Sequence, residues 1–298
     1  MIETPRPAGN IYDLGYRPYE GERLGRQYAL VALFTYSFKA VFGLGRSGWN
    51  KVFPMGLAIM AILPAFLQLS FAALTPVDIT LVEPQSYFSL VWWVVPLFAA
   101  VVTPEIIGRD HRNRTLPLYF SRTLSRFDYI SAKVGALFVA IFLVLAAPQL
   151  FLLVGNAFGT DDVVGYLWDN LRDIPPILAT SALAAAFMSA ISLAIASQTD
   201  RRGLATGAVI ASVSIFTLLG QILLATVPET GSLRAYTILV SPLDVLNGMT
   251  YFMFGATPPP EAAIARTDLA GVVYLLATLA YTAVALAWVY RRFLRLLV

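Results

Sequence analysis

Six stretches of the sequence are long and apolar enough to cross a membrane, and they constrain the fold more than any other feature. A helix needs about 20 mostly apolar residues to span the ~30 Å hydrocarbon layer of a bilayer. These stretches carry apolar residues on every helical face, unlike the one-sided pattern of a surface helix. They are Val52–Leu74, Ser86–Ile107, Tyr129–Gly155, Ile174–Gln198, Leu204–Val227 and Leu269–Tyr290. The sequence therefore predicts an all-α, polytopic membrane protein with six transmembrane helices.

The composition excludes other classes of protein. Hydrophobic residues make up 58% of the 298 residues and charged residues 13%, where a soluble domain has about 45–50% and about 25%. A soluble core cannot hide so many apolar side chains, which excludes an ordinary cytosolic enzyme. The chain has no cysteine, so thiolate nucleophiles, iron–sulfur clusters and cysteine-ligated zinc are excluded as well.

The basic residues fall almost entirely on one side of the six stretches. Eighteen of the 21 lysines and arginines lie in residues 1–51, around the segment after the second stretch, after the fourth stretch, or in the C-terminal tail. Only Arg172, Arg234 and Arg266 lie on the other side. Because basic segments stay in the cytoplasm, we expect a multi-pass protein with both termini cytoplasmic.

A further apolar segment, Tyr28–Gly45, predicts a helix that lies in the membrane interface. Lys39 inside a span would cost roughly 2.5–3.5 kcal/mol. On a helical wheel of this segment, the polar residues lie on one face and the apolar residues on the opposite one. The polar face holds Thr35, Lys39 and Arg46, and the apolar face holds Leu30, Leu33, Val41 and Leu44. The alternative, a seventh span, would place the basic N-terminal cluster outside. We therefore divide the chain into residues 1–51, a cytoplasmic segment with an amphipathic interfacial helix, and residues 52–298, a six-helix transmembrane domain.

The span interiors carry no Asp, Glu, Lys, Arg or His, so they offer no proton relay or ion site. Glu105 and Lys133 lie only at the cytoplasmic ends of their stretches. The single His111 cannot form an H-E-x-x-H motif, and no lysine stands in a G-x-x-x-x-G-K-[ST] phosphate loop. We expect no catalytic, cofactor-binding or metal site, and a protein that is not an enzyme and takes its energy from another chain.

The segment between the second and third stretches is the most informative. An apolar turn lies between two basic groups: Arg109, Arg112 and Arg114 precede Leu116, Leu118, Tyr119 and Phe120, and Arg122 and Arg126 follow. Ser125 and Asp128 have the spacing of a capping box, which predicts the start of the next helix. Such a segment must bury its apolar side against lipid or against a protein.

This segment resembles the coupling loop of permease subunits of type-2 ATP-binding-cassette (ABC) exporters. The matching residues are Asp110, Arg114, Thr115, Leu116, Ser125, Arg126, Tyr129 and Lys133. The N-terminal stretch Tyr12–Arg26 and the long outer segment 228–268, with Ser241-Pro242-Leu243, are similar to this group too. One position departs from the pattern, since Arg114 stands where these permeases usually have Gly before the Thr.

The resemblance implies a permease that exports an amphipathic or hydrophobic substrate from a bacterial or archaeal cell, in the plasma membrane. ATP and Mg²⁺ would be bound by a separate ABC ATPase subunit, and none by this chain. A second copy or a paralogue would complete a central pathway, membrane lipid would surround it, and no nucleic acid is expected. The alternative is a membrane scaffold or assembly subunit that transports no solute of its own.

The resemblance also assigns residues to roles. A coupling helix within residues 108–128 would contact the ATPase through Arg109, Asp110, Arg114, Thr115, Leu116, Leu118, Tyr119 and Arg122. Candidate pathway or gate residues are Trp92, Trp93, Tyr251, Phe252 and Phe254. The last three lie in the extracytoplasmic loop 228–268, for which short gating helices and a solvated lid are both open.

Overall fold

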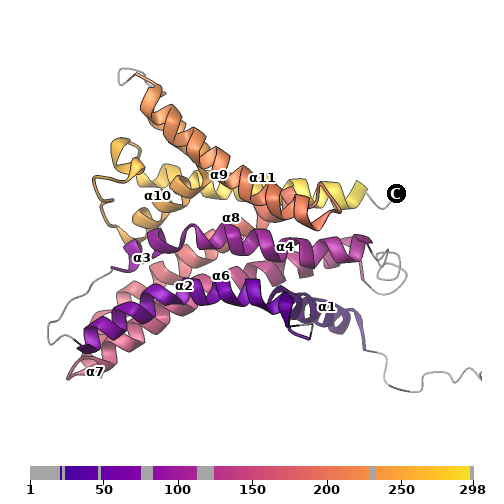
Figure 1. The fold of residues 1–298 in the computed structure, drawn as a ribbon, viewed down its shortest axis with the longest axis horizontal. Helices are drawn as coiled ribbons and strands as arrows, with labels where there is room; N and C mark the ends of the chain where they lie inside the picture. The colour runs from indigo at the N-terminus through magenta and orange to yellow at the C-terminus, as the bar shows by residue number, and fades with distance from the viewer. Residues whose placement is uncertain are drawn as a thin grey trace, which may run out of the picture.

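The computed structural model describes residues 21, 24–45, 48–74, 83–112, 124–228 and 233–295, and these residues form helices and turns without a strand. The helices are α1 (Arg26–Val41), α2 (Trp49–Leu74), α3 (Pro84–Val91), α4 (Val94–Arg112), α6 (Arg126–Phe158), α7 (Val163–Asp169), α8 (Ile174–Ala196), α9 (Arg202–Thr226), α10 (Pro242–Phe254) and α11 (Gly271–Arg295). Three short 3₁₀ helices join them, η1 (Leu171–Asp173), η2 (Ala235–Val240) and η3 (Ala263–Arg266). Figure 1 shows their arrangement.

Five of the described helices are long and apolar enough to cross a membrane, namely α2, α6, α8 with η1, α9 and α11. The pair α3 and α4 makes a sixth span if it is counted as one, although it is bent by 52°. Pro96 explains the bend, because it has no N–H to donate to the carbonyl of Trp92 four residues earlier and its ring crowds that carbonyl. The predicted all-α fold is confirmed, and the second predicted span is broken at Trp92–Trp93.

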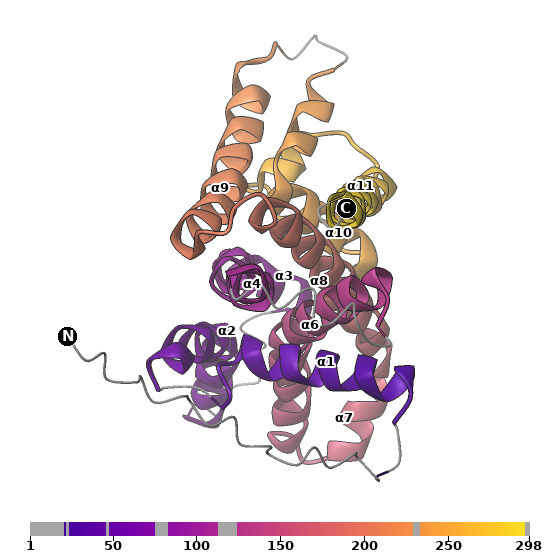
Figure 2. The same cartoon turned by 90° about the vertical axis from the view of Figure 1, so that its right-hand side faces the viewer.

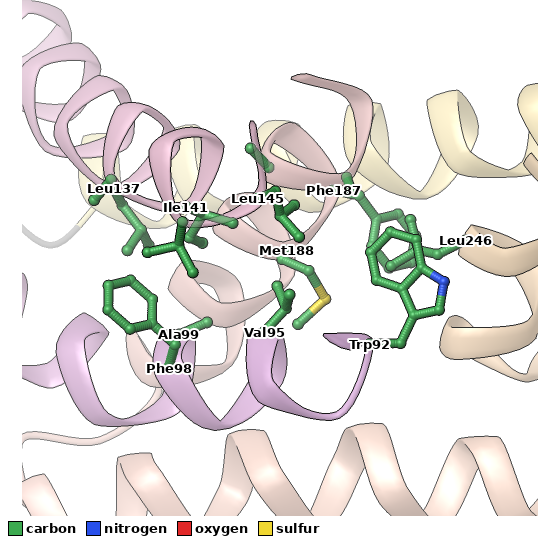
Figure 3. Close-up of a cluster of buried hydrophobic side chains, with 14 of the residues drawn as sticks. Trp92, Val95, Phe98, Ala99, Leu137, Ile141, Leu145, Phe187, Met188 and Leu246 are labelled. Carbon is green, nitrogen blue, oxygen red and sulfur yellow. The ribbon is translucent and has the colours of Figure 1, made fainter. Parts of the chain in front are cut away.

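The centre of the bundle is formed by α8 and α6, the most enclosed of the five continuous spans, together with α4, whose residues are mostly buried. Ser181, Ala185 and Ser189 recur every fourth residue on α8 and are all buried, so their small side chains let the neighbouring helices approach closely. Figure 3 shows Phe98 of α4, Ile141 of α6 and Met188 of α8 meeting in this core. By contrast, α2, α9 and α11 expose much of their apolar surface, as a lipid-facing helix can.

The first helix, α1, lies across the end of the bundle, while α4 and α11 are seen end-on in the same view (Figure 2). It packs against α6 and buries Leu33 and Val41, while Lys39 is exposed. With 16 residues, α1 is not among the candidate spans, and its place in the membrane interface stays a prediction. Leu44 was wrongly placed on the apolar face: it is 45% exposed, because the helix ends at Val41 and the helical wheel does not extend to it.

The outer segment folds back into the bundle as η2, α10 and η3. Helix α10 packs against α8, α9 and α11 and buries most of its length, so it is not a solvated lid. Ser241 caps it by accepting a hydrogen bond from the Asp244 N–H at 3.2 Å. Gly255, with φ of 61°, ends it in the left-handed conformation that glycine tolerates. The predicted short helices are present, and a gating role stays a prediction.

The turn between η2 and α10 touches α9 at Gly220, and we expect this close approach to be sensitive to one added methyl group. A Cβ at Gly220 would lie 2.7 Å from the Cβ of Ser241. Gly220→Ala should therefore destabilise the fold by about 1–3 kcal/mol through overpacking. Gly207→Ala on the same helix is the control, because nothing lies within 4 Å of its added Cβ, and it should leave stability unchanged or raise it by up to about 1 kcal/mol. Thermal unfolding of the purified protein in detergent measures both, and equal effects would contradict the close contact.

Candidate functional site

The candidate site is the end of the bundle where α4 finishes and α6 begins, on either side of residues 113–123. Helix α1, the start of α9 and the end of α11 gather at the same end (Figure 1). The segments rich in basic residues therefore meet at one end of the molecule. That this end faces the cytoplasm stays a prediction.

A buried ion pair joins α4 to α6 at this end. The ammonium of Lys133 lies 2.7 Å from Oδ2 of Asp110 and donates a hydrogen bond to the carbonyl of Ile106 at 2.9 Å. The hydroxyl of Tyr129 donates to the same Asp110 oxygen at 2.7 Å, and the Lys133 ammonium lies 5.3 Å from the centre of the Tyr129 ring. Lys133 is only 2% exposed. A charge buried this deeply needs such partners, because losing one would leave the other uncompensated.

The start of α6 is tied to α1 by a second charged contact. Ser125 and Asp128 form the predicted capping box, with the Asp128 N–H donating to Ser125 Oγ and the Ser125 N–H donating to Asp128 Oδ2. The guanidinium of Arg26 reaches both carboxylate oxygens of Asp128, at 2.8 Å each. One carboxylate thus caps α6 and anchors α1, and the two-point geometry fixes their relative orientation.

Further polar contacts reach α9 and α11. Glu105 of α4 pairs with Arg202 at the start of α9 at 2.6 Å. Arg126 donates to the carbonyl of Leu294 in α11 at 3.2 Å. The contacts that hold α11 here also include Ser131 with Tyr290 at 2.9 Å and Arg292 with Gln198, in the turn after α8, at 3.0 Å.

These contacts tie the end of the bundle into one mechanical unit. The end of α4 is tied to α6 and α9, and the start of α6 is tied to α1 and α11. Residues 113–123 connect these two tied points. A displacement of that connection would therefore act on several spans together, because packed helices move as rigid elements.

The predicted coupling residues fall into two groups. Asp110 lies in the buried ion pair, so its contact with a partner would be indirect, through the tie between α4 and α6. Arg109 belongs to the last turn of α4. The others lie outside the described residues: Arg114, Thr115, Leu116, Leu118, Tyr119 and Arg122. Their role in coupling stays a prediction.

The predicted pathway residues gather only in part, around the break between α3 and α4. Trp92 is buried and stacks on Phe88 at 5.6 Å between ring centres, and Phe254 of α10 lies 6.1 Å from the same Phe88 ring. Figure 3 shows Trp92 beside Phe187 and Leu246. The other three diverge, with Tyr251 buried in α10 while Trp93 is 53% exposed and Phe252 is 41% exposed.

The ion pairs themselves were missed by sequence reasoning, although every charged member was visible. Arg26 and Asp128 are 102 residues apart, and Glu105 of α4 pairs with Arg202 of α9. The sequence does show residues of opposite charge at the same predicted ends of the spans, which indicates that ion pairs can form there. It does not show which residues pair, because that depends on how the helices pack.

We expect removal of one partner of the buried pair to be far worse than removal of both charges. Lys133→Met leaves Asp110 charged and buried, which should cost about 3–5 kcal/mol of stability. The double variant Asp110→Asn with Lys133→Met should recover most of this loss. Thermal unfolding in detergent provides the measurement.

Arg201→Met serves as the control, because the Arg201 side chain is exposed. Substitutions at exposed positions usually change stability by less than about 0.5 kcal/mol, so this variant should unfold close to the parent. A double variant no more stable than Lys133→Met alone would show that the two charges do not stabilise each other.

The comparisons with known proteins bear on the whole chain. The family model described as ABC-2 family transporter protein matches residues 23–296, a range that includes every described helix. No curated protein matches the sequence.

Proposed function

This chain belongs to the ABC-2 transporter family, and from that premise we propose that it is the permease of an exporter driven by a separate ABC ATPase. The family match over residues 23–296 is the observation that carries the proposal. The exported molecule is amphipathic or hydrophobic, and a second copy or a paralogue of this chain completes the pathway. ATP and Mg²⁺ bind to the partner ATPase.

The distribution of charge supports an apolar or amphipathic substrate. Within the spans, the ionised side chains that form described ion pairs are concentrated at the end where α4 and α6 meet. Ion and proton transporters rely on ionisable groups within the membrane. A pathway between helices of this composition suits a molecule with an apolar part.

The polar contacts between helices transmit the movement of the ATPase-binding segment to the spans. The ATPase binds residues 113–123 and moves them when it closes on ATP. The Asp110–Lys133 pair carries the movement to α4 and α6, and the Glu105–Arg202 pair carries it to α9. Asp110 and Glu105, one member of each pair, both belong to α4, so this helix receives the movement first.

The same helix reaches the other end of the bundle through its bent continuation, α3. There Ser89 of α3 donates a hydrogen bond to the Asn247 side chain of α10 at 2.9 Å, and Phe88 contacts Phe254. Tilting of α4 and α3 therefore displaces α10, and α10 with Tyr251 and Phe254 opens or closes the exit. Residues 1–51 and both termini lie on the cytoplasmic side of a bacterial or archaeal plasma membrane.

The proposal is tested by introducing charge into the segment that binds the ATPase. Leu116→Glu with Tyr119→Glu should abolish co-purification of an ABC ATPase with the tagged chain, because the apolar contact of the coupling helix is lost. ATP-dependent movement of a fluorescent amphiphile in proteoliposomes should be lost with it. Quantitative mass spectrometry of the purified complex gives the first measurement and vesicle fluorescence gives the second.

Val164→Glu is the control, because Val164 lies on α7 at the opposite end and is 76% exposed. It should keep both the ATPase and transport. An unchanged amount of ATPase with the Leu116 and Tyr119 variant would refute the coupling role. A complex that hydrolyses ATP but moves no amphiphile would instead identify a scaffold subunit.

A further inference from the structure

A short connection, formed by α7 and η1, joins α6 to α8 at the end of the bundle opposite α1 (Figure 1). The carboxylate of Asp162 caps α7 by accepting a hydrogen bond from the Gly165 N–H at 2.9 Å. The helix packs against α6, yet none of the residues in α7 and η1, all of which the structure describes, is fully buried. The connection takes no part in the ion pairs described at the α4–α6 end.

One side of this connection is apolar and exposed. Val164 and Trp168 lie four residues apart on α7, and each is 76% exposed; Leu171 follows in η1 and is 50% exposed. Side chains at these spacings lie on one face of a helix, and a helical wheel places Asp162 and Asp169 on the opposite face. Large apolar side chains gathered on an exposed face indicate a contact with lipid or with another protein.

The last turns of α6 carry the same kind of surface up to the point where the connection begins. Phe151, Val154 and Phe158 recur at helical spacing and are all exposed, Phe158 by 74%. Helix α6 is one of the candidate spans, and an exposed apolar side of a span can contact lipid. The exposed apolar surface therefore runs along the chain from a span into α7, which favours lipid as the contact.

The length of α6 sets the depth at which α7 lies. With 33 residues, α6 is about 50 Å long, and a bilayer with its headgroup layers is about 40–45 Å thick. The charge of Lys133 marks one edge of the hydrocarbon layer. About 20 residues from there cross the ~30 Å layer, so Val154 lies near the opposite edge and Phe158 lies about 6 Å beyond it. The connection that follows is therefore level with the lipid headgroups.

We propose that α7 and η1 lie in the membrane interface, with Val164, Trp168 and Leu171 inserted into lipid where the headgroups meet the acyl chains. Tryptophan suits this depth, because its ring is apolar and its N–H finds a hydrogen-bond acceptor there. Asp162 and Asp169 face water. Apolar contact therefore provides the binding, since an acidic face does not attract anionic lipid. The inference depends neither on the transported molecule nor on the ATPase.

This contact anchors the two helices that the connection joins. Residue Asp173 ends η1, and α8 begins at Ile174, so the connection holds the ends of both α6 and α8. Lipid contact there fixes the depth of two helices at the centre of the bundle. A single charge near the headgroups costs only about 0–1 kcal/mol, because it can reach water, so Val164→Glu remains compatible with a folded protein.

The depth of α7 is measured by spin labelling of the full chain in phosphatidylcholine nanodiscs. The chain has no cysteine, so single cysteines are introduced without removing others. Trp168→Cys and Leu171→Cys report on the apolar face. Their neighbours in the sequence, Asp169→Cys and Arg172→Cys, are the matched controls, because both native side chains are also exposed. Oxygen, which concentrates in lipid, should relax the first two labels more than a water-soluble nickel chelate does, and the controls should show the reverse.

Two results of this measurement would overturn the inference. A stronger effect of nickel than of oxygen at all four positions would place α7 in water. Low access of both reagents to the labels at Trp168→Cys and Leu171→Cys would show that protein covers this face, and dipolar coupling between labels on two molecules would identify a second copy as that protein. Replacing part of the phosphatidylcholine by phosphatidylglycerol should not raise the oxygen preference, and a clear rise would contradict binding by apolar contact.

A second set of variants tests whether the apolar side chains hold α7 in place. With the label at Val164→Cys, the double variant Trp168→Ser with Leu171→Ser should lower the oxygen preference, because the apolar area that enters lipid is reduced. Asp169→Ser with Arg172→Ser is the matched control and should leave it unchanged. Both proteins should unfold in detergent like the parent, since these side chains are exposed. An equal loss of oxygen preference in the two double variants would refute the anchor.

Discussion

The ion pair between Asp110 and Lys133 is the interaction on which the rest of this structure depends. Most contacts between the spans are apolar, and in lipid such contacts hold helices by packing alone, without the drive to escape from water. A buried ion pair fixes the relative position of the two helices, because burying either charge without its partner is energetically costly. With Tyr129 and the Ile106 carbonyl as further partners, the pair fixes where α4 ends relative to α6.

That fixed point couples one end of the molecule to the other. Helix α4 carries both the pair to α6 and the Glu105 pair to α9, and it continues through the bend at Trp92–Trp93 into α3. Helix α3 in turn contacts α10 through Ser89 and Phe88. A single bent span therefore connects the segment that would receive an ATPase with the short helices at the proposed exit.

Much of the fold could be predicted because it depends on local chemistry. The six apolar stretches correspond to the five spans and the bent pair. The capping box at Ser125 forms as its spacing predicts. The error at Leu44 has the same origin, since a helical wheel assumes a helix and this one ends at Val41. The partners of Asp110, Glu105 and Asp128 could not be predicted, because they are brought together only by helix packing.

The sequence by itself determined that the chain is a helical membrane protein and where its apolar helices lie, and it predicts that most basic residues share one side. These properties follow from the transfer of side chains into lipid and from backbone hydrogen bonding within single segments. The tertiary structure decided which charges pair and that α10 packs into the bundle. Each of these joins residues from different helices, and the close approach of helices depends on small residues such as Gly220 and on the shapes they present to one another.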